Sequence, residues 1–185
     1  QLGYGGIRNS LAIEFDTHYN PEMLEPYQNH IAVHTRGWRH QNEANQSFAL
    51  GSAVRSVPDL TDGTHTARIR YTTEFDHALL WTGAFESNGY AAHFLENADH
   101  KNGALADWGT GLGTMTIWID DMETPVLTVP LNLDSTLDLH HGRAWVGFTA
   151  ATGDDTWQVH DILQWTFRSS REDIPMEPAI LVNDV

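Results

Sequence analysis

The distribution of hydrophobic residues along the chain predicts a protein built mainly from short β-strands. In residues 11–16 every second side chain is large and apolar, and residues 30–35 and 65–73 repeat the pattern. A period of two is typical of a strand that buries one face and leaves the other in a polar environment. We therefore expect three strands in these segments.

Weaker segments of the same kind follow at fairly regular spacing, and Gly, Pro and Asn residues separate them. They are residues 47–54, 114–120, 126–129, 136–140, 144–151 and 157–169. Few segments have the helical period, and the sequence has no internal repeat. Short strands at this spacing predict an all-β sandwich or jelly roll.

Residues 74–112 interrupt the succession of strands with a long insert. Five large aromatic side chains lie in it, whereas a flexible linker is rich in Gly and Ser. They are Trp81, Phe85, Tyr90, Phe94 and Trp108. Because long structureless loops are rare in compact domains, we expect the insert to be ordered and packed. Residues 1–171 then form one domain, and residues 172–185 form a tail with no clear periodicity.

The composition excludes some partners. The chain of 185 residues carries 25 acidic and 10 basic side chains, for a formal net charge of −15. Such a surface repels nucleic acid and anionic membranes, so we expect neither partner. No apolar run approaches the ~18 residues of a membrane span. The chain has no cysteine, so the fold does not depend on disulfides.

The densest group of acidic side chains lies around the first two strands. These strands deliver Glu14, Asp16 and His30 to one place, and the loop between them adds Asn20 and Glu25. Clustered carboxylates repel each other, and a divalent cation offsets the repulsion. Oxygen donors alone suit calcium, whereas a set that includes the imidazole suits a transition ion such as manganese or zinc. The alternative is a solvated acidic loop with a surface histidine.

Two motifs resemble known proteins. The run SLAIEFDT, followed by Asn20, Pro26 and the run HIAV, resembles the metal-binding segment of the legume (L-type) lectins. The runs WVGFTAATG and HDILQWTF, within residues 145–167, resemble the closing strands of the same family. The resemblance implies a concanavalin A-like jelly roll, with residues 74–112 inserted and the N-terminal third of the family absent. It also implies a secreted or cell-surface lectin that binds a glycan or glycoprotein and depends on calcium.

The resemblance also assigns metal ligands. Carried over position by position, they are Glu14, Asp16, the main-chain carbonyl of His18, Asn20, Glu25 and His30. In the family, Asp stands where this chain has Glu25. The extra methylene moves the carboxylate by roughly 1.5 Å, about the length of one carbon–carbon bond. We therefore expect calcium to be retained and a second ion, manganese or another transition ion, to depend on adjustment of the loop.

Sugar binding needs a few fixed polar groups and an aromatic face. By resemblance, Asn20 links calcium to a sugar hydroxyl, and the loop of residues 153–158 sets specificity. The family's sugar-binding Asp belongs to the absent third, and Asn88 is a candidate to replace it. The predicted carbohydrate-binding residues are Asn20, Asn88, Gly153, Asp154, Asp155 and Trp157. Trp157 is either a stacking platform or a packed side chain.

Two other functions are alternatives to the lectin. Glucanases with this jelly roll carry Glu-x-Asp-x-Glu on a strand, and here Glu14 and Asp16 begin the pattern but His18 or Tyr19 stands where the second Glu belongs. No cysteine or Gly-x-Ser-x-Gly nucleophile is present, so we expect no enzyme. The remaining alternative is a structural or adhesive module with a degraded sugar site. Its partners would be further copies of the chain or a larger extracellular assembly.

Overall fold

A computed structural model of the chain describes residues 2–76, 113–139, 143–153 and 156–169. Most of the predicted insert and the whole predicted tail lie outside these ranges, so their predicted order and boundary remain predictions. The chain divides into two compact units, Gln1–Ala151 and Thr152–Val185. No helix among the described residues is long and apolar enough to cross a membrane.

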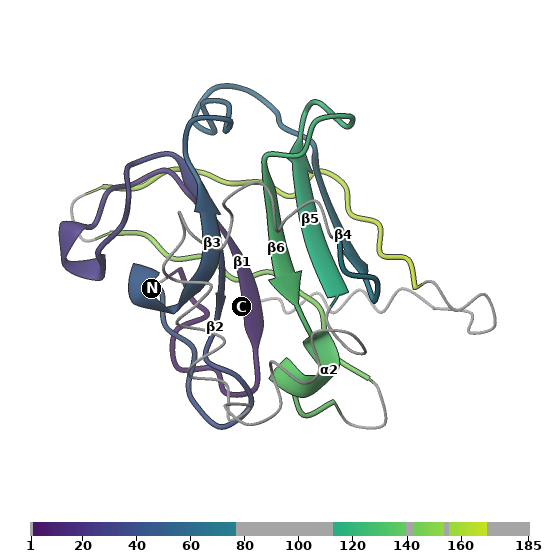
Figure 1. Cartoon of the computed structure of the whole chain (residues 1–185). Helices are drawn as coiled ribbons and strands as arrows, with labels where there is room; N and C mark the ends of the chain where they lie inside the picture. The colour runs from purple at the N-terminus through teal and green to yellow at the C-terminus, as the bar shows by residue number, and fades with distance from the viewer. Residues whose placement is uncertain (1, 77–112, 140–142, 154–155, 170–185) are drawn as a thin grey trace. The chain divides into compact units, whose positions relative to one another are not determined.

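All named elements of the described chain belong to the first unit. They are β1 (Leu11–Asp16), η1 (Pro21–Met23), β2 (His30–Thr35), η2 (Gln46–Phe48), β3 (Ala49–Ala53), β4 (Ala67–Thr72), β5 (Gly113–Ile119), β6 (Leu127–Leu131) and α2 (Leu133–Thr136). They form two antiparallel three-stranded sheets, in the orders β1-β2-β3 and β4-β5-β6 (Figure 1). The predicted all-β sandwich is confirmed.

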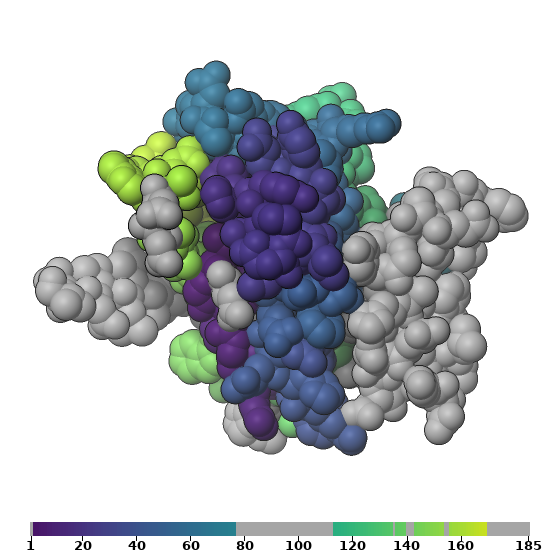
Figure 2. All heavy atoms as spheres, turned by 90° about the vertical axis from the view of Figure 1, so that its left-hand side faces the viewer, coloured from purple at the N-terminus to yellow at the C-terminus, as the bar shows by residue number. Residues whose placement is uncertain are grey.

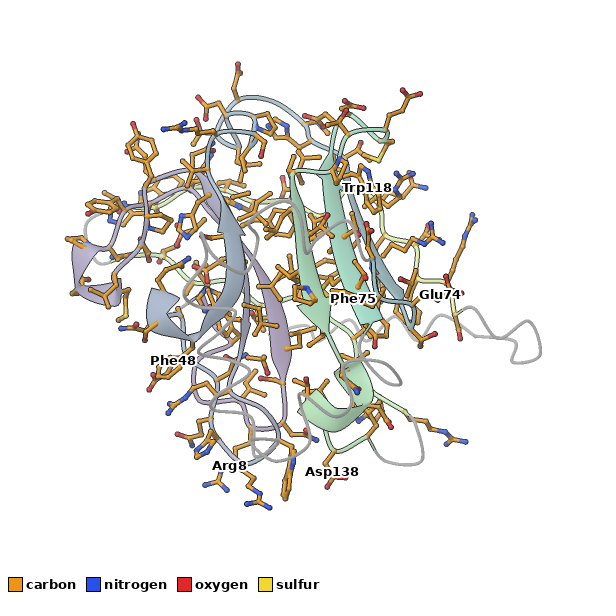
Figure 3. All side chains as sticks on the ribbon, in the orientation of Figure 1. Arg8, Phe48, Glu74, Phe75, Trp118 and Asp138 are labelled. Atoms are coloured by element: carbon orange, nitrogen blue, oxygen red, sulfur yellow. The ribbon has the colours of Figure 1, made fainter. Side chains whose placement is uncertain are left out.

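The hydrophobic core lies between the two sheets. Ile31, Val33 and Leu50 from the first sheet join Ile117 and Leu131 from the second in one buried cluster. Strand β3 contacts β6 across this core, and side chains fill the space between the sheets (Figure 3). A fully buried aliphatic side chain of this size contributes about 1.5–3 kcal/mol. The alternating apolar positions of the sequence therefore hold the sheets together.

One predicted strand is replaced by a helical turn. The sequence pattern predicts a strand at residues 136–140, but Thr136 ends α2 and the described residues 137–139 form no strand. The Thr136 hydroxyl and amide both donate to the carbonyl of Asn132, at 2.6 and 3.0 Å. These bonds close a turn, and Leu137 is buried directly after it. Local hydrogen bonding therefore overrides the weak strand propensity here.

The strands predicted at 144–151 and 157–169 are also wrong for the residues that the structure describes. Neither segment carries regular secondary structure, although both are rich in apolar and β-branched residues. Trp145 in the first segment and Leu163 in the second are exposed. A strand needs a ladder partner, and neither segment takes part in any ladder among the described strands. The apolar pattern therefore did not reveal that these segments lack a pairing partner among the described strands.

Candidate metal centre

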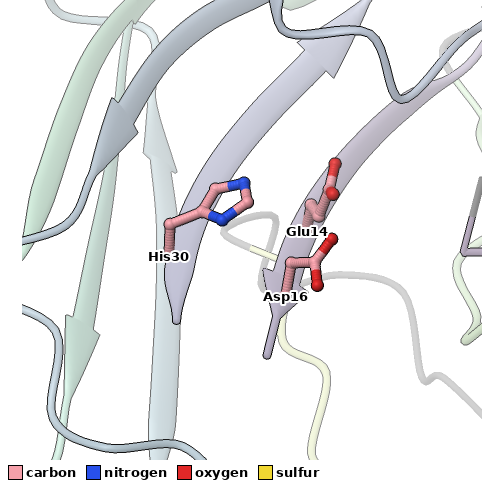
Figure 4. Close-up of side chains that lie close together, drawn as sticks. All are labelled: Glu14, Asp16 and His30. Carbon is pink, nitrogen blue, oxygen red and sulfur yellow. The ribbon is translucent and has the colours of Figure 1, made fainter. Parts of the chain in front are cut away.

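The pairing of β1 with β2 brings the first acidic side chains together with a histidine. Asp16 lies opposite His30 in the antiparallel register. Ile13 and Phe15 pack toward the core, so Glu14 and Asp16 project from the other face of β1. One potential ligand atom from each of Glu14, Asp16 and His30 lies within 4.8 Å of the others (Figure 4). All three are buried, with 2%, 4% and 0% of their surface exposed.

The two oxygens of the Glu14 carboxylate have different surroundings. The residue opposite Glu14 is Ala32, whose small side chain leaves Glu14 room between His30 and His34. Oε2 accepts a hydrogen bond of 2.5 Å from the Tyr4 hydroxyl. It also lies 3.0 Å from Nε2 of His34, within ion-pair distance but not in line for a hydrogen bond. Oε1 is buried and has no hydrogen-bond partner.

The loop between β1 and β2 folds over this cluster. The main-chain amide of His18 donates to Oδ1 of Asp16 at 2.7 Å, and the amide of Asn20 donates to Oε2 of Glu25. Pro21 starts the short helix η1, because its fixed φ suits a first helical position. The residues around η1 form the molecular surface on this side (Figure 2). Glu25 is therefore buried close to the cluster but outside the group within 4.8 Å.

Burial and mutual repulsion make these carboxylates difficult to ionise. Burial, with a contribution from Glu14, raises the pKa of Asp16 to about 6 although the His18 amide opposes the change. Burial also raises the pKa of Glu25 to about 7, and the charges of Asp16 and Glu14 add to the effect. A cation beside these groups would favour their ionised forms. The protein therefore concentrates negative charge where a cation would relieve the repulsion.

In contrast to Asp16 and Glu25, the pKa values of Glu14 and His30 are lowered. Burial alone would raise the pKa of Glu14, but the contacts from His34 and Tyr4 outweigh it and hold the pKa below its usual value. Burial lowers the pKa of His30, so the ring is neutral near pH 7. The Tyr27 main chain approaches this ring, yet neither ring nitrogen has an aligned hydrogen-bond partner. A neutral imidazole with a free nitrogen is the form that binds a metal.

The donor set fits a divalent cation. It combines buried carboxylate oxygen with imidazole nitrogen, and Oε1 of Glu14 and both ring nitrogens of His30 lack partners. Buried polar atoms are rarely left without a partner unless a ligand or water takes the place. Of the six predicted metal ligands, the structure gathers Glu14, Asp16 and His30. The loop residues His18, Asn20 and Glu25 are bonded around them, and their role as ligands remains a prediction.

The predicted carbohydrate-binding residues belong to different compact units or lie outside the described residues. Asn20 lies on the loop beside the metal cluster, and its side chain donates to Glu22 at 3.3 Å. Gly153 and Trp157 belong to the second compact unit, where Trp157 is 78% exposed and therefore not a packed side chain. Asn88, Asp154 and Asp155 lie outside the described residues. The role of all six residues in sugar binding remains a prediction.

Sequence reasoning missed Tyr4 and His34. For His34 a signal existed, because the alternation of β2 puts His30, Ala32 and His34 on the same face as Glu14. For Tyr4 no local pattern gives the contact, since a loop carries it onto the sheet. The two rings also pack together, with centroids 5.9 Å apart.

Comparisons with known proteins agree with the fold. The family model of the legume lectin domain matches residues 104–181, less than half of the chain. The matched range includes both closing motifs, whereas the acidic segment lies before it. No curated protein matches the chain. Legume lectin domains bind carbohydrate and are generally not enzymes. Residues 104–181 are thus similar to a legume lectin domain, and the two antiparallel sheets are consistent with the β-sandwich of such lectins.

Proposed function

We propose that the chain is a non-catalytic domain that binds a glycan or glycoprotein outside the cell and that this binding depends on calcium. The observation that carries the proposal is the buried group of Glu14, Asp16 and His30 with its unpartnered ligand atoms. The family match supports the carbohydrate ligand. The excess of acidic residues is consistent with an exterior that contains calcium.

Two cations would share the cluster. Glu14, Asp16, Glu25 and His30 would hold a transition ion, because the set mixes oxygen with nitrogen. Asp16, the carbonyl of His18, Asn20 and Glu25 would hold calcium, because all their donors are oxygen. When bound, the cations supply positive charge that neutralises the buried carboxylates and ties the loop to β1. The hydrogen bonds from the His18 amide to Asp16 and from the Asn20 amide to Glu25 support this assignment, because they hold the loop beside these carboxylates.

Sugar binding would follow from the order of the loop. The side-chain amide of Asn20 has one oxygen for a cation and one nitrogen that donates to a sugar hydroxyl. This part of the loop makes local contacts through the His18 and Asn20 amides, the Asn20 side chain and the short helix η1, whereas a cation would tie it to β1. Loss of the cation would therefore weaken carbohydrate binding without unfolding the sandwich.

The acidic cluster is poorly suited to hydrolysis. Retaining glycosidases need two carboxyl groups about 5–5.5 Å apart that both reach the substrate. Glu14 is only 2% exposed, and Tyr4 and His34 occupy one of its oxygens. A substrate has no access to this carboxylate, which supports a binding role over a catalytic one.

A glycan array tests the proposal. Wild-type protein should bind one class of glycan in calcium, lose the signal in chelator and regain it when calcium returns. Asp16→Asn should fail to bind in calcium, whereas Glu123→Gln, which changes an exposed acidic residue far from the cluster in sequence, should bind like wild type. Silence of the correctly folded wild type on a broad array would contradict the proposal.

Exposed aromatic residues favour a second candidate, an adhesive module of a larger extracellular assembly. In the first unit Trp145 and Phe148 are exposed, and in the second unit Trp157 and Trp165 are exposed. Large exposed apolar side chains often mark contacts with a partner. Under this alternative the protein would be silent on the array and would assemble or bind a partner chain, which light scattering and cross-linking would detect.

A further inference from the structure

The side chains behind Glu14 point to a role in choosing the metal. Tyr4 and His34 both approach Oε2, at 2.5 and 3.0 Å, whereas Oε1 has no hydrogen-bond partner. The carboxylate therefore has one occupied oxygen and one free oxygen, both in a buried environment. Glu14, Asp16 and His30 are the residues of the proposed cation site, and Tyr4 and His34 lie outside that group.

We propose that Tyr4 and His34 are positioning residues that hold Oε2 of Glu14, so that only Oε1 is available to a metal and the site prefers a first-row transition ion to calcium. The inference rests on the proposed cation site. Calcium takes six to eight oxygen ligands and often uses both oxygens of a carboxylate. A single carboxylate oxygen beside an imidazole suits a smaller ion with fewer ligands.

The surroundings of the two positioning residues keep Glu14 in this orientation. His34 is fully buried and Tyr4 nearly so, and their rings pack against each other. The side chain of Asn42 donates to the His34 carbonyl at 3.2 Å and so restrains its main chain. Turning the carboxylate to offer both oxygens would break the Tyr4 hydrogen bond and the His34 contact together. Both losses would occur without water to replace them, which makes them costly.

The contacts also favour a charged carboxylate. Tyr4 donates a hydrogen bond to Oε2, and Nε2 of His34 lies 3.0 Å from the same oxygen. Partners of this kind around a metal ligand typically change metal affinity 10–100-fold when they are removed. We therefore expect the loss of the Tyr4 or His34 contact to reduce manganese affinity more than calcium affinity, because only the transition-ion site uses Glu14.

Calorimetry on metal-free protein, with manganese and calcium titrated separately, tests the inference. His34→Leu keeps the approximate volume but removes the polar nitrogen, and Tyr4→Phe removes a single hydroxyl. Each should weaken manganese binding about 10–100-fold and change calcium binding by less than about threefold. His34→Gln places an amide nitrogen near the position of Nε2 and should restore the preference for manganese. The exposed Glu123→Gln is the matched control.

The outcomes separate the inference from the proposed function. If folded Tyr4→Phe and His34→Leu keep the wild-type ratio of manganese to calcium affinity, the positioning role is wrong. Equal losses for His34→Gln and His34→Leu would also overturn it, because the imidazole would then act only through packing. If wild type binds neither metal, the proposed function itself fails. Melting of each variant in chelator reports folding, and Tyr4→Phe decides the question if His34→Leu does not fold.

Discussion

The isosteric substitution Asp16→Asn should have opposite effects on stability with and without metal. In metal-free protein at pH 8, Asp16 is a buried charge beside Glu14. Asn removes the charge and keeps an oxygen that accepts from the His18 amide, as Asp16 does at 2.7 Å. The variant should therefore be the more stable protein in chelator. In calcium the order should reverse, because the wild type alone gains from the cation.

The magnitude follows from the pKa of Asp16. Raising it from 3.8 to about 6 corresponds to about 3 kcal/mol at 1.36 kcal/mol per pH unit. Solvent screening and relaxation around the site reduce the expected gain to about 1–2 kcal/mol. For a domain of this size that is roughly 2–8 °C in Tm. The wild type should gain about 2.7 kcal/mol when calcium is at a hundredfold excess over its Kd.

The difference in stability between wild type and Asp16→Asn depends on pH. Because the pKa of Asp16 is raised in the folded state, the folded protein keeps a proton between about pH 4 and pH 6 that the unfolded chain has released. As the pH rises from about 4 to 6, the free energy of unfolding of the wild type therefore falls relative to that of Asp16→Asn. The difference in free energy of unfolding between Asp16→Asn and the wild type should be near zero at pH 4 and should reach its full value by pH 8.

Urea unfolding of metal-free protein, followed by tryptophan fluorescence at pH 4, 6 and 8, measures these differences. The same titrations at pH 8 with calcium give the metal-bound comparison. A variant that is less stable than wild type in chelator at pH 8 would refute the reasoning. So would a wild type whose unfolding midpoint does not move when calcium is added.

Three further predictions concern the loop, the core and the sheet edge. Glu25→Asp should tighten manganese binding about three- to tenfold, because it removes the extra methylene. Calorimetry measures this affinity. An equal or weaker affinity in the variant would show that the loop has adapted to Glu25. Ile117→Ala should lower the free energy of unfolding by about 2–5 kcal/mol, because the side chain is fully buried between the sheets. Ile69→Ala on the edge strand β4 should lower the free energy of unfolding by less than half as much, since Ile69 is 45% exposed. Equal losses for the two variants in urea unfolding would contradict the assigned core.

The parts of the fold that the sequence predicts well are those with a strong local pattern. The strands at residues 11–16 and 30–35 have the predicted bounds, because each alternates cleanly and turn-forming residues flank it. The pattern fails at residues 144–151 and 157–169. Alternation says which side chains share a face, but it does not say whether a neighbouring strand is available to complete the ladder.

The candidate site likewise contains residues whose meeting the sequence predicts and residues whose contacts it does not predict. Glu14, Asp16 and His30 meet because two predictable strands pair in register, so their meeting follows from period and spacing. The contact of Tyr4 with Glu14 depends on the path of the N-terminal loop across the sheet. That path is set by tertiary packing, and no spacing within the sequence predicts it. The covering hydrogen bond from Asn20 to Glu25 is likewise a property of the folded loop.

The most direct test of the central claim is to locate the cation itself. Crystals grown with manganese and measured at its absorption edge should show an anomalous peak between Glu14, Asp16 and His30. The peak should lie nearer Oε1 of Glu14 than Oε2, with Tyr4 still hydrogen-bonded to Oε2. A map without a peak at saturating manganese, or with the ion held only by exposed carboxylates elsewhere, would contradict the account.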